Sequence, residues 1–202
     1  MPATAAMPAA AAISILIVGV GGQGTLLASR LIGRAATERG FDVKVSEVHG
    51  MSQRGGSVVT YVKYGGEVSS PLIEPGEADI LIAFELLEAA RWIPYLRPGG
   101  QIVANSQKID PMPVITGAAR YPDGLAEVLR EKCEGALVVD ALTIATECGN
   151  ARSVNMVLLG LAARFTAFGE DEWMGAIRAV APPKALEANI RAFGRGYALS
   201  MA

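Results

Sequence analysis

The stretch that decides the fold is Ile13-Ser14-Ile15-Leu16-Ile17-Val18, followed directly by Gly19-Val20-Gly21-Gly22-Gln23-Gly24. Its first half is short, mostly apolar and rich in β-branched residues, which predicts a strand buried on both faces of a parallel sheet. Helical periodicity follows from Gln23 to Arg39, and Gly40 stands where a helix C-cap belongs. A second strand is expected to begin at Val43. These residues predict one strand, helix, strand unit.

Strands and helices continue to alternate along the rest of the chain. Gly65-Gly66 predict a hairpin turn between two of the strands, and the period is helical from Ser153 onward. The further strands are expected at 57–64, 67–73, 79–84, 101–104 and 137–140, and the helices before residue 153 at 85–95 and 123–133. We therefore expect an α/β fold, a three-layer Rossmann-like domain with a mostly parallel (mixed) sheet and a helical C-terminal third. Residues 13–202 are expected to form this single domain, and residues 1–12 a flexible N-terminal tail.

The composition is short of charge for a domain of this size. Of the 202 residues, 51% are apolar and 19% are charged, whereas a typical soluble domain has about 25% charged residues. A large buried core explains part of this shortage. A partner that covers part of the surface is a second explanation.

Charge and cysteine content exclude several classes of function. The net charge of -2 and the lack of a basic run argue against a nucleic-acid partner. The apolar stretch from Ala9 to Val20 falls short of the roughly 18 residues of a membrane-spanning helix, and the N-terminus has no basic signal region. We therefore expect a cytoplasmic protein with no membrane partner. Cys133 and Cys148 lack metal-ligand spacing, so we expect no metal site and place any redox centre on another chain.

The glycine turn has the pattern G-x-G-x-x-G between a strand and a helix. Gly19, Gly21 and Gly24 would allow a tight turn and let backbone N–H groups approach a phosphate at the helix N-terminus. The same glycines also serve packing alone. Glu47 stands roughly where a dehydrogenase keeps the acid that holds the adenosine ribose. A free-standing NAD-binding Rossmann dehydrogenase is therefore one interpretation, although the segment after Glu47 joins two strands instead of entering a crossover helix.

The loop from Glu47 to Gly56 gathers the unusual chemistry of the chain, including its single histidine, His49. Loops at the carboxyl ends of strands form the ligand crevice of a doubly wound sheet, so this loop and the glycine turn should face the same side. Arg54, followed by Gly55 and Gly56, suits a bidentate clamp on a carboxylate or phosphate. The alternative is an ion pair between Arg54 and Glu47. His49 is either a general base or, more commonly, a hydrogen-bonded structural residue.

Two asparagines and the remaining turn residues complete the candidate site. Asn105 follows the expected strand 101–104, and Asn155 begins the helical C-terminal part. Either amide could contact a ligand, whereas the structural alternatives are a turn-forming bond for Asn105 and a helix-start bond for Asn155. Gly22 and Gln23 belong to the candidate site as members of the glycine turn.

These motifs resemble the gamma-type domain of the 2-oxoacid:ferredoxin oxidoreductase family. The resemblance is carried by the glycine turn 19–24 and by Ser46-Glu47-Val48-His49-Gly50-Met51-Ser52-Gln53-Arg54-Gly55-Gly56-Ser57-Val58. It extends to Val103-Ala104-Asn105-Ser106 and to Asn155-Met156-Val157-Leu158-Leu159-Gly160. Within the family, the motif His-Gly-Met-Ser-Gln-Arg-Gly-Gly at residues 49–56 is most similar to that of the small (beta) subunits of the members that use indolepyruvate.

The resemblance implies a two-subunit oxidoreductase whose large (alpha) subunit carries thiamine diphosphate and [4Fe-4S] clusters. The implied reaction is oxidative decarboxylation of an aryl 2-oxoacid, with coenzyme A and ferredoxin, to an aryl-acyl-CoA and carbon dioxide. The near alternative is a gamma subunit for pyruvate, 2-oxoisovalerate or 2-oxoglutarate. By this resemblance the chain binds no cofactor alone, is inactive alone, and supplies no catalytic residue.

The residues implied to complete the active site would face the large subunit near the thiamine and coenzyme A pocket. They are Gly19, Gly21, Gly22, Gln23, Gly24, Glu47, His49, Arg54, Gly55, Gly56, Asn105 and Asn155.

Overall fold

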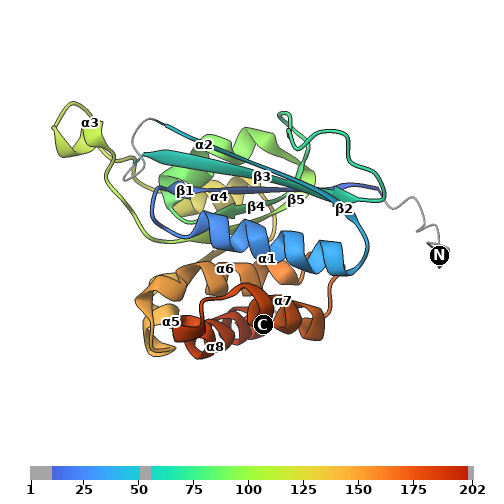
Figure 1. Ribbon diagram of the computed structural model, residues 1–202. Helices are drawn as coiled ribbons and strands as arrows, with labels where there is room; N and C mark the ends of the chain where they lie inside the picture. The colour runs from blue at the N-terminus through green and yellow to red at the C-terminus, as the bar shows by residue number, and fades with distance from the viewer. Residues whose placement is uncertain (1–10, 51–55, 200–202) are drawn as a thin grey trace, which may run out of the picture.

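The computed structural model describes residues 11–50 and 56–199, and these form one mixed sheet covered by helices on both faces (Figure 1). The sheet order is β2-β3-β1-β4-β5-β6. Strand β3 runs antiparallel to both of its neighbours, and the pairs β1–β4, β4–β5 and β5–β6 are parallel. The strands are β1 (Ile13–Val20), β2 (Asp42–His49), β3 (Ser57–Gly65), β4 (Ala78–Ala83), β5 (Leu96–Asn105) and β6 (Leu137–Val139). The predicted mostly parallel α/β sheet is confirmed.

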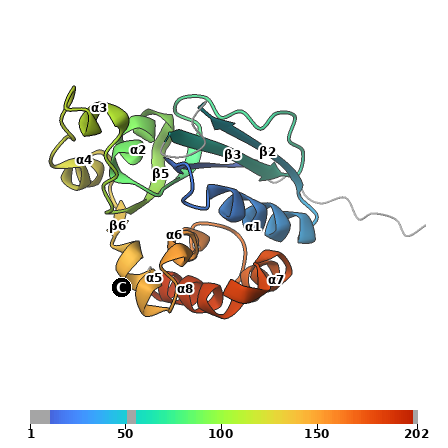
Figure 2. The same ribbon diagram turned by 60° about the vertical axis from the view of Figure 1, so that its left-hand side comes forward.

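The helices form unequal layers on the two faces of this sheet. Helices α2 and α4 cover one face, whereas α1 and α6 cover the other, with α5 and α8 packed outside α6 and α7 packed against α1 (Figures 1 and 2). Their bounds are α1 (Thr25–Glu38), α2 (Leu86–Trp92), α3 (Met112–Ile115), α4 (Leu125–Lys132), α5 (Ala141–Glu147), α6 (Val154–Ala163), α7 (Glu170–Val180) and α8 (Leu186–Leu199). Short 3-10 turns span Ile93–Tyr95, Ala151–Ser153 and Pro183–Ala185. None of the helices in the described ranges is long and apolar enough to span a membrane.

Strand β1 lies at the centre of the core, as its sequence predicts. Ile15, Leu16, Ile17 and Val18 are all completely buried. Because side chains alternate across a strand, Ile15 and Ile17 pack into the cluster beneath α1 and α6, whereas Leu16 and Val18 pack into the cluster beneath α2 and α4. The strand therefore belongs to both halves of the core.

Helix α6 is buried over all ten of its residues, which explains why its sequence is apolar all round. It packs against α8 with direct backbone contact. A Cβ at Gly160 would lie 2.2 Å from the Phe193 carbonyl oxygen, and a Cβ at Gly196 would lie 2.1 Å from the Val157 carbonyl oxygen. Glycine at both positions is therefore a packing requirement of this crossing.

One strand expected within the described residues is absent, and two short helices, α3 and α5, were not expected. Residues 67–73 form no strand, because β3 is already paired with β2 on one side and β1 on the other, which leaves no edge for a hairpin partner. Pro71 also lacks the N–H group that a ladder needs. Val68 and Ile73 are nevertheless buried, so these apolar residues pack into the protein without forming a strand. Helix α5 was not expected, because its seven residues give less than two full turns of periodic pattern.

The α6–α8 crossing gives a direct test of the fold. Gly196→Ala should lower the free energy of unfolding by about 1–3 kcal/mol or more, because the added methyl group overlaps a backbone oxygen. Gly194→Ala is the matched control on the same helix, since nothing lies within 4 Å of its Cβ position. The control should be neutral or stabilising by up to about 1 kcal/mol. Urea denaturation followed by circular dichroism measures both, and equal effects would contradict the packing described.

Candidate functional site

The candidate site lies at the point where the chain connections leave the sheet in opposite directions. After β1 the chain passes to α1 on one face, and after β4 it passes to α2 on the other face. A crevice forms at such a switch point, outside the carboxyl ends of the strands. The glycine turn 19–24 lies in this crevice. We call this side of the sheet the carboxyl edge.

The glycines of the turn are needed for different physical reasons. Gly24 has φ +90°, and a Cβ there would lie 2.8 Å from Asn155 Nδ2, while a Cβ at Gly19 would lie 2.9 Å from the Cβ of Phe84. Packing alone therefore requires both. Gly22 has φ +102° with open space around its Cβ position. Gly24 is the N-cap of α1 and provides no side-chain cap, so the first N–H groups of this helix are left for another acceptor.

Gln23 and Asn105 tie three strand ends together through one carbonyl group. Gln23 accepts the Val20 N–H at 2.7 Å and donates its Nε2 to the Phe84 oxygen at 3.0 Å. Asn105 also donates to the Phe84 oxygen, at 3.3 Å, and accepts the Ala141 N–H at 3.1 Å. Asn105 is completely buried. It braces the ends of β4 and β5 and the start of α5. Its Nδ2 also donates to Gln107 Oε1 at 3.2 Å, two residues along the chain, so a local bond accompanies the two long-range ones.

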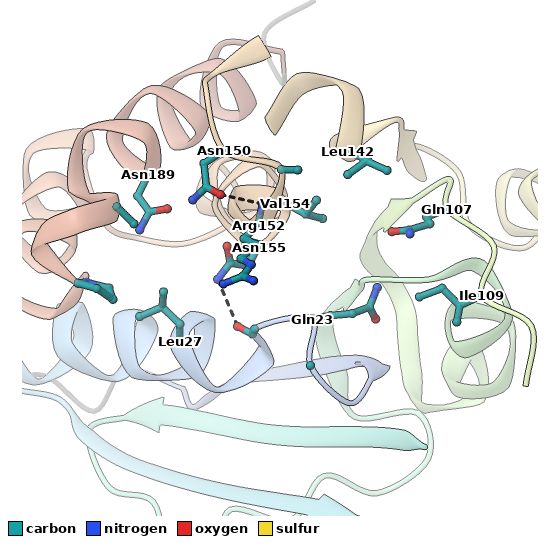
Figure 3. A pocket seen from close by; sticks show the side chains of 15 residues that line it. Gln23, Leu27, Gln107, Ile109, Leu142, Asn150, Arg152, Val154, Asn155 and Asn189 are labelled. Atoms are coloured by element: carbon teal, nitrogen blue, oxygen red, sulfur yellow. Dashed lines mark hydrogen bonds between the residues drawn. The ribbon is translucent and has the colours of Figure 1, made fainter. Parts of the chain in front are cut away.

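A cavity of about 750 Å³ opens on one side of the glycine turn, toward α6 and α8 (Figure 3). Five amide side chains line it, and Arg152 is the one charged residue among its 15 lining residues. The amides are Gln23, Gln107, Asn150, Asn155 and Asn189. Neutral hydrogen-bonding groups, one cation and an uncapped helix N-terminus suit a polar ligand that carries negative charge.

Asn155 is the most distinctive of these amides. It is 3% exposed, and its Nδ2 donates to the Gly24 carbonyl oxygen at 3.3 Å. Its Oδ1 is buried and has no hydrogen-bond partner among the residues that the structure describes. The helix-start bond considered as the structural alternative is not made, because the side chain instead ties α6 to the glycine turn through Nδ2 and leaves Oδ1 without a partner among the described residues.

A second cavity of about 390 Å³ lies on the other side of the turn. It brings the turn residues Gly21 and Gly24 together with Glu47 and His49, so the two loops share the carboxyl edge as predicted. His49 Nδ1 lies 3.9 Å from Glu47 Oε1, and the Thr60 hydroxyl donates to Glu47 Oε2 at 3.2 Å. Glu47 thus has local partners of its own.

The backbone also joins the two loops, since the Gly21 N–H donates to the Gly56 oxygen at 2.9 Å. Arg54 and Gly55 lie outside the described residues. The clamp and the ion pair with Glu47 both remain predictions.

The strand order argues against the dinucleotide interpretation. In a dehydrogenase the strand that carries the ribose-binding acid lies next to the first strand. Here β3 is inserted between β1 and β2. Strand β2, which carries Glu47, therefore lies two strand spacings, roughly 10 Å, from β1, whereas a neighbouring strand would lie roughly 5 Å away. The Gly21 N–H is also already bonded to Gly56.

The sequence did not single out four of the residues that line the larger cavity. Asn150 and Arg152 belong to the polar turn between α5 and α6, Asn189 lies on α8, and Gln107 follows β5. Nothing in their local pattern marks them, because they come from three separate segments of the chain and meet only in the folded structure. No group of three or more His, Cys, Asp or Glu that could hold a metal ion occurs within residues 11–50 and 56–199.

The α/β fold is one that solved 2-oxoacid:ferredoxin oxidoreductases also contain. The structure is similar to a keto/oxoacid ferredoxin oxidoreductase gamma subunit from Geobacter sulfurreducens, with a TM-score of 0.70, 22% identity, and coverage of 94% of this chain and 98% of that one. It is also similar to part of a chain of the 2-oxoglutarate:ferredoxin oxidoreductase from Magnetococcus marinus, with a TM-score of 0.69 and 21% identity, covering 94% of this chain and 31% of that one.

The chain belongs to the family described as pyruvate ferredoxin/flavodoxin oxidoreductase, whose model matches residues 14–199. It is 42% identical over 188 residues to the indolepyruvate oxidoreductase subunit IorB of Thermococcus kodakarensis, covering 91% of this chain and 93% of that protein. The chain is therefore a small subunit of a 2-oxoacid:ferredoxin oxidoreductase, and the family resemblance inferred from its motifs is confirmed.

The two bonds of the Gln23 side chain predict a measurable stability loss on truncation. Gln23→Ala should lower the free energy of unfolding by about 1–3 kcal/mol, because it leaves the Val20 N–H and one bond of the Phe84 oxygen unmade. Gln101→Ala is the control, since the Gln101 Nε2 donates a long hydrogen bond of 3.5 Å to the Gly99 carbonyl oxygen. The control should change stability by less than about 0.5 kcal/mol. A loss for Gln23→Ala no larger than for the control, by urea titration, would show that the brace is unimportant.

Proposed function

We propose that this chain is the small subunit of a cytoplasmic oxidoreductase that decarboxylates indolepyruvate, or another aryl 2-oxoacid, oxidatively. The products are an aryl-acyl-CoA and carbon dioxide, and the electrons pass to ferredoxin. The carboxyl edge of the small subunit faces the large subunit and completes its active site. The observation that carries the substrate assignment is the 42% identity to a protein named for indolepyruvate, over nearly the whole of both chains.

The chain's residues do not suit two of the cofactors that this reaction needs. The described residues offer no cluster of metal-ligating side chains, and the larger cavity at the carboxyl edge is lined by amides and one arginine in place of carboxylates. Thiamine diphosphate is held through a divalent cation such as Mg²⁺, which proteins bind through one or two carboxylates, and iron–sulfur clusters require cysteine thiolates. We therefore assign both to the large subunit.

Coenzyme A is the component that the carboxyl edge fits. The Arg152 guanidinium favours a phosphate group at the larger cavity, which is also lined by Gly24, the N-cap residue of α1 that provides no side-chain cap. The buried Asn155 Oδ1 is an acceptor for an N–H or O–H donor of a ligand or partner, once the side chains around it shift. A structural relative, 31% of whose chain matches this one, has been solved with 2-oxoglutarate, coenzyme A and succinyl-CoA bound, so coenzyme A is a ligand of that enzyme.

Reconstitution of the purified small and large subunits tests the proposed function. We expect each subunit alone to be inactive and the mixture to reduce viologen with indolepyruvate and coenzyme A. Pyruvate, 2-oxoisovalerate and 2-oxoglutarate should be poorer substrates by kcat/KM. Full activity of the large subunit alone would overturn the proposal, and a preference for an aliphatic 2-oxoacid would overturn the substrate assignment.

The same assay locates coenzyme A on the small subunit. Arg152→Ala should raise the KM for coenzyme A about tenfold, the effect of losing roughly 1.4 kcal/mol of charge-assisted bonding, while leaving the KM for indolepyruvate unchanged. Arg130→Ala is the control, because Arg130 on α4 is exposed, as Arg152 is, but does not line the larger cavity. An unchanged KM for coenzyme A in Arg152→Ala would contradict the placement of its phosphates at this cavity.

A further inference from the structure

An arm projects from the sheet at the carboxyl edge. It comprises residues 106–124, between β5 and α4, and carries the short helix α3 at its tip. Figure 1 shows α3 standing clear of the body of the protein. None of the residues 106–124 is buried. A segment of this length with so little burial is unusual for a connection within a domain.

The tip of the arm is apolar. Met112 and Ile115 are 64% and 65% exposed, the highest values among the exposed large apolar side chains of the described residues. The tip sequence, residues 111–119, is Pro-Met-Pro-Val-Ile-Thr-Gly-Ala-Ala and contains no charged residue. Scattered exposed apolar side chains are normal on a protein surface. Two such side chains on an uncharged, projecting tip are typical of an interaction site.

The base of the arm is fixed by a buried carboxylate. Glu85 is 1% exposed, and it accepts the Ile109 N–H at 3.1 Å and the Tyr121 hydroxyl. The Tyr121 oxygen in turn accepts the Leu87 N–H at 3.1 Å. Burial, and then the hydrogen bond to Glu85, raise the pKa of Tyr121, so its hydroxyl stays protonated at neutral pH and continues to donate. The two ends of the arm are thereby held at one point.

The tip is also ordered by its own hydrogen bonds. The Val114 N–H donates to the Pro111 oxygen and the Ala119 N–H to the Pro113 oxygen, both at 2.9 Å. The Thr116 hydroxyl donates to the Met112 oxygen at 2.9 Å. A preformed tip on a fixed base loses little conformational entropy when it binds. The arm is therefore built to present Met112 and Ile115.

The position of the arm identifies its partner. Gln107 and Ile109, at its base, line the same cavity as the glycine turn. Leu26 and Leu142, which line the two cavities of the carboxyl edge, are themselves 44% and 38% exposed. The arm thus continues the apolar, weakly charged surface that the proposed function places against the large subunit.

A second copy of this chain is the less suitable occupant. Two apolar side chains on one turn of helix cover only a small part of the roughly 1,200 Å² that a stable interface buries, so the arm must add to a larger contact beside it. A similar fold also forms 31% of a longer oxidoreductase chain, where the remaining protein belongs to the same enzyme.

We propose that Met112 and Ile115, at the tip of the arm, insert into an apolar groove of the large subunit and anchor the small subunit to it. This inference rests on the proposed function, because that function supplies the partner. It adds an attachment point that is separate from the residues assigned to coenzyme A.

The test measures binding of the full-length small subunit to the purified large subunit by calorimetry. The double variant Met112→Asp/Ile115→Asp should raise the Kd at least tenfold, because two carboxylates would enter an apolar groove. Leu72→Asp is the matched control, since Leu72 is 54% exposed on the connection between β3 and β4, and it should change the Kd less than twofold. Circular dichroism melting should be unchanged in all variants, because these side chains are exposed.

The outcomes separate this proposal from the proposed function. If the wild-type chain binds and the double variant binds equally well, the arm is not the anchor, although the proposed function stands. If the wild-type chain does not bind the large subunit at all, both proposals fail. If the isolated wild-type chain sediments as a dimer that the double variant dissociates, with the Kd for the large subunit unchanged, the arm serves a second copy and the proposal is overturned.

Discussion

The carbonyl oxygen of Phe84 is the group on which the carboxyl edge depends. Phe84 directly follows strand β4, and its carbonyl oxygen accepts hydrogen bonds from both Gln23 and Asn105. These two amides fix the end of β1 and the end of β5 relative to the end of β4, and Asn105 also holds the start of α5. The glycine turn and the N-terminus of α1 directly follow β1, and the base of the arm directly follows β5. Their common orientation follows from the bonds to the Phe84 oxygen.

The antiparallel strand β3 gives the site its particular form. By separating β1 from β2 it removes the acid Glu47 from the ribose position of a dinucleotide fold, and it brings Gly56 to the N–H of Gly21. The resulting edge has two open cavities, and the larger one is lined by one arginine and several amides. Exposed apolar side chains lie beside both cavities. Such a surface is better suited to being covered by another protein than to facing water.

Local sequence pattern predicted the features that depend on neighbouring residues. The buried strand β1, the glycine turn and the helix α1 all follow from their own residue order, and the joint position of turn and loop follows from strand direction. The strand expected at 67–73 failed because pairing depends on which edges are free, and that is decided by β2, far away in the chain. Asn189 reached the site through the α6–α8 crossing, which no local pattern encodes.

The central claim is that the carboxyl edge is the face that the large subunit covers. Hydrogen–deuterium exchange of the small subunit, free and in the complex, tests it most directly. We predict slower exchange on complex formation in peptides covering 19–26, 106–121 and 150–155, with unchanged exchange in 93–101 at the opposite edge. Protection confined to 93–101, with the glycine turn and the arm unaffected, would contradict the account.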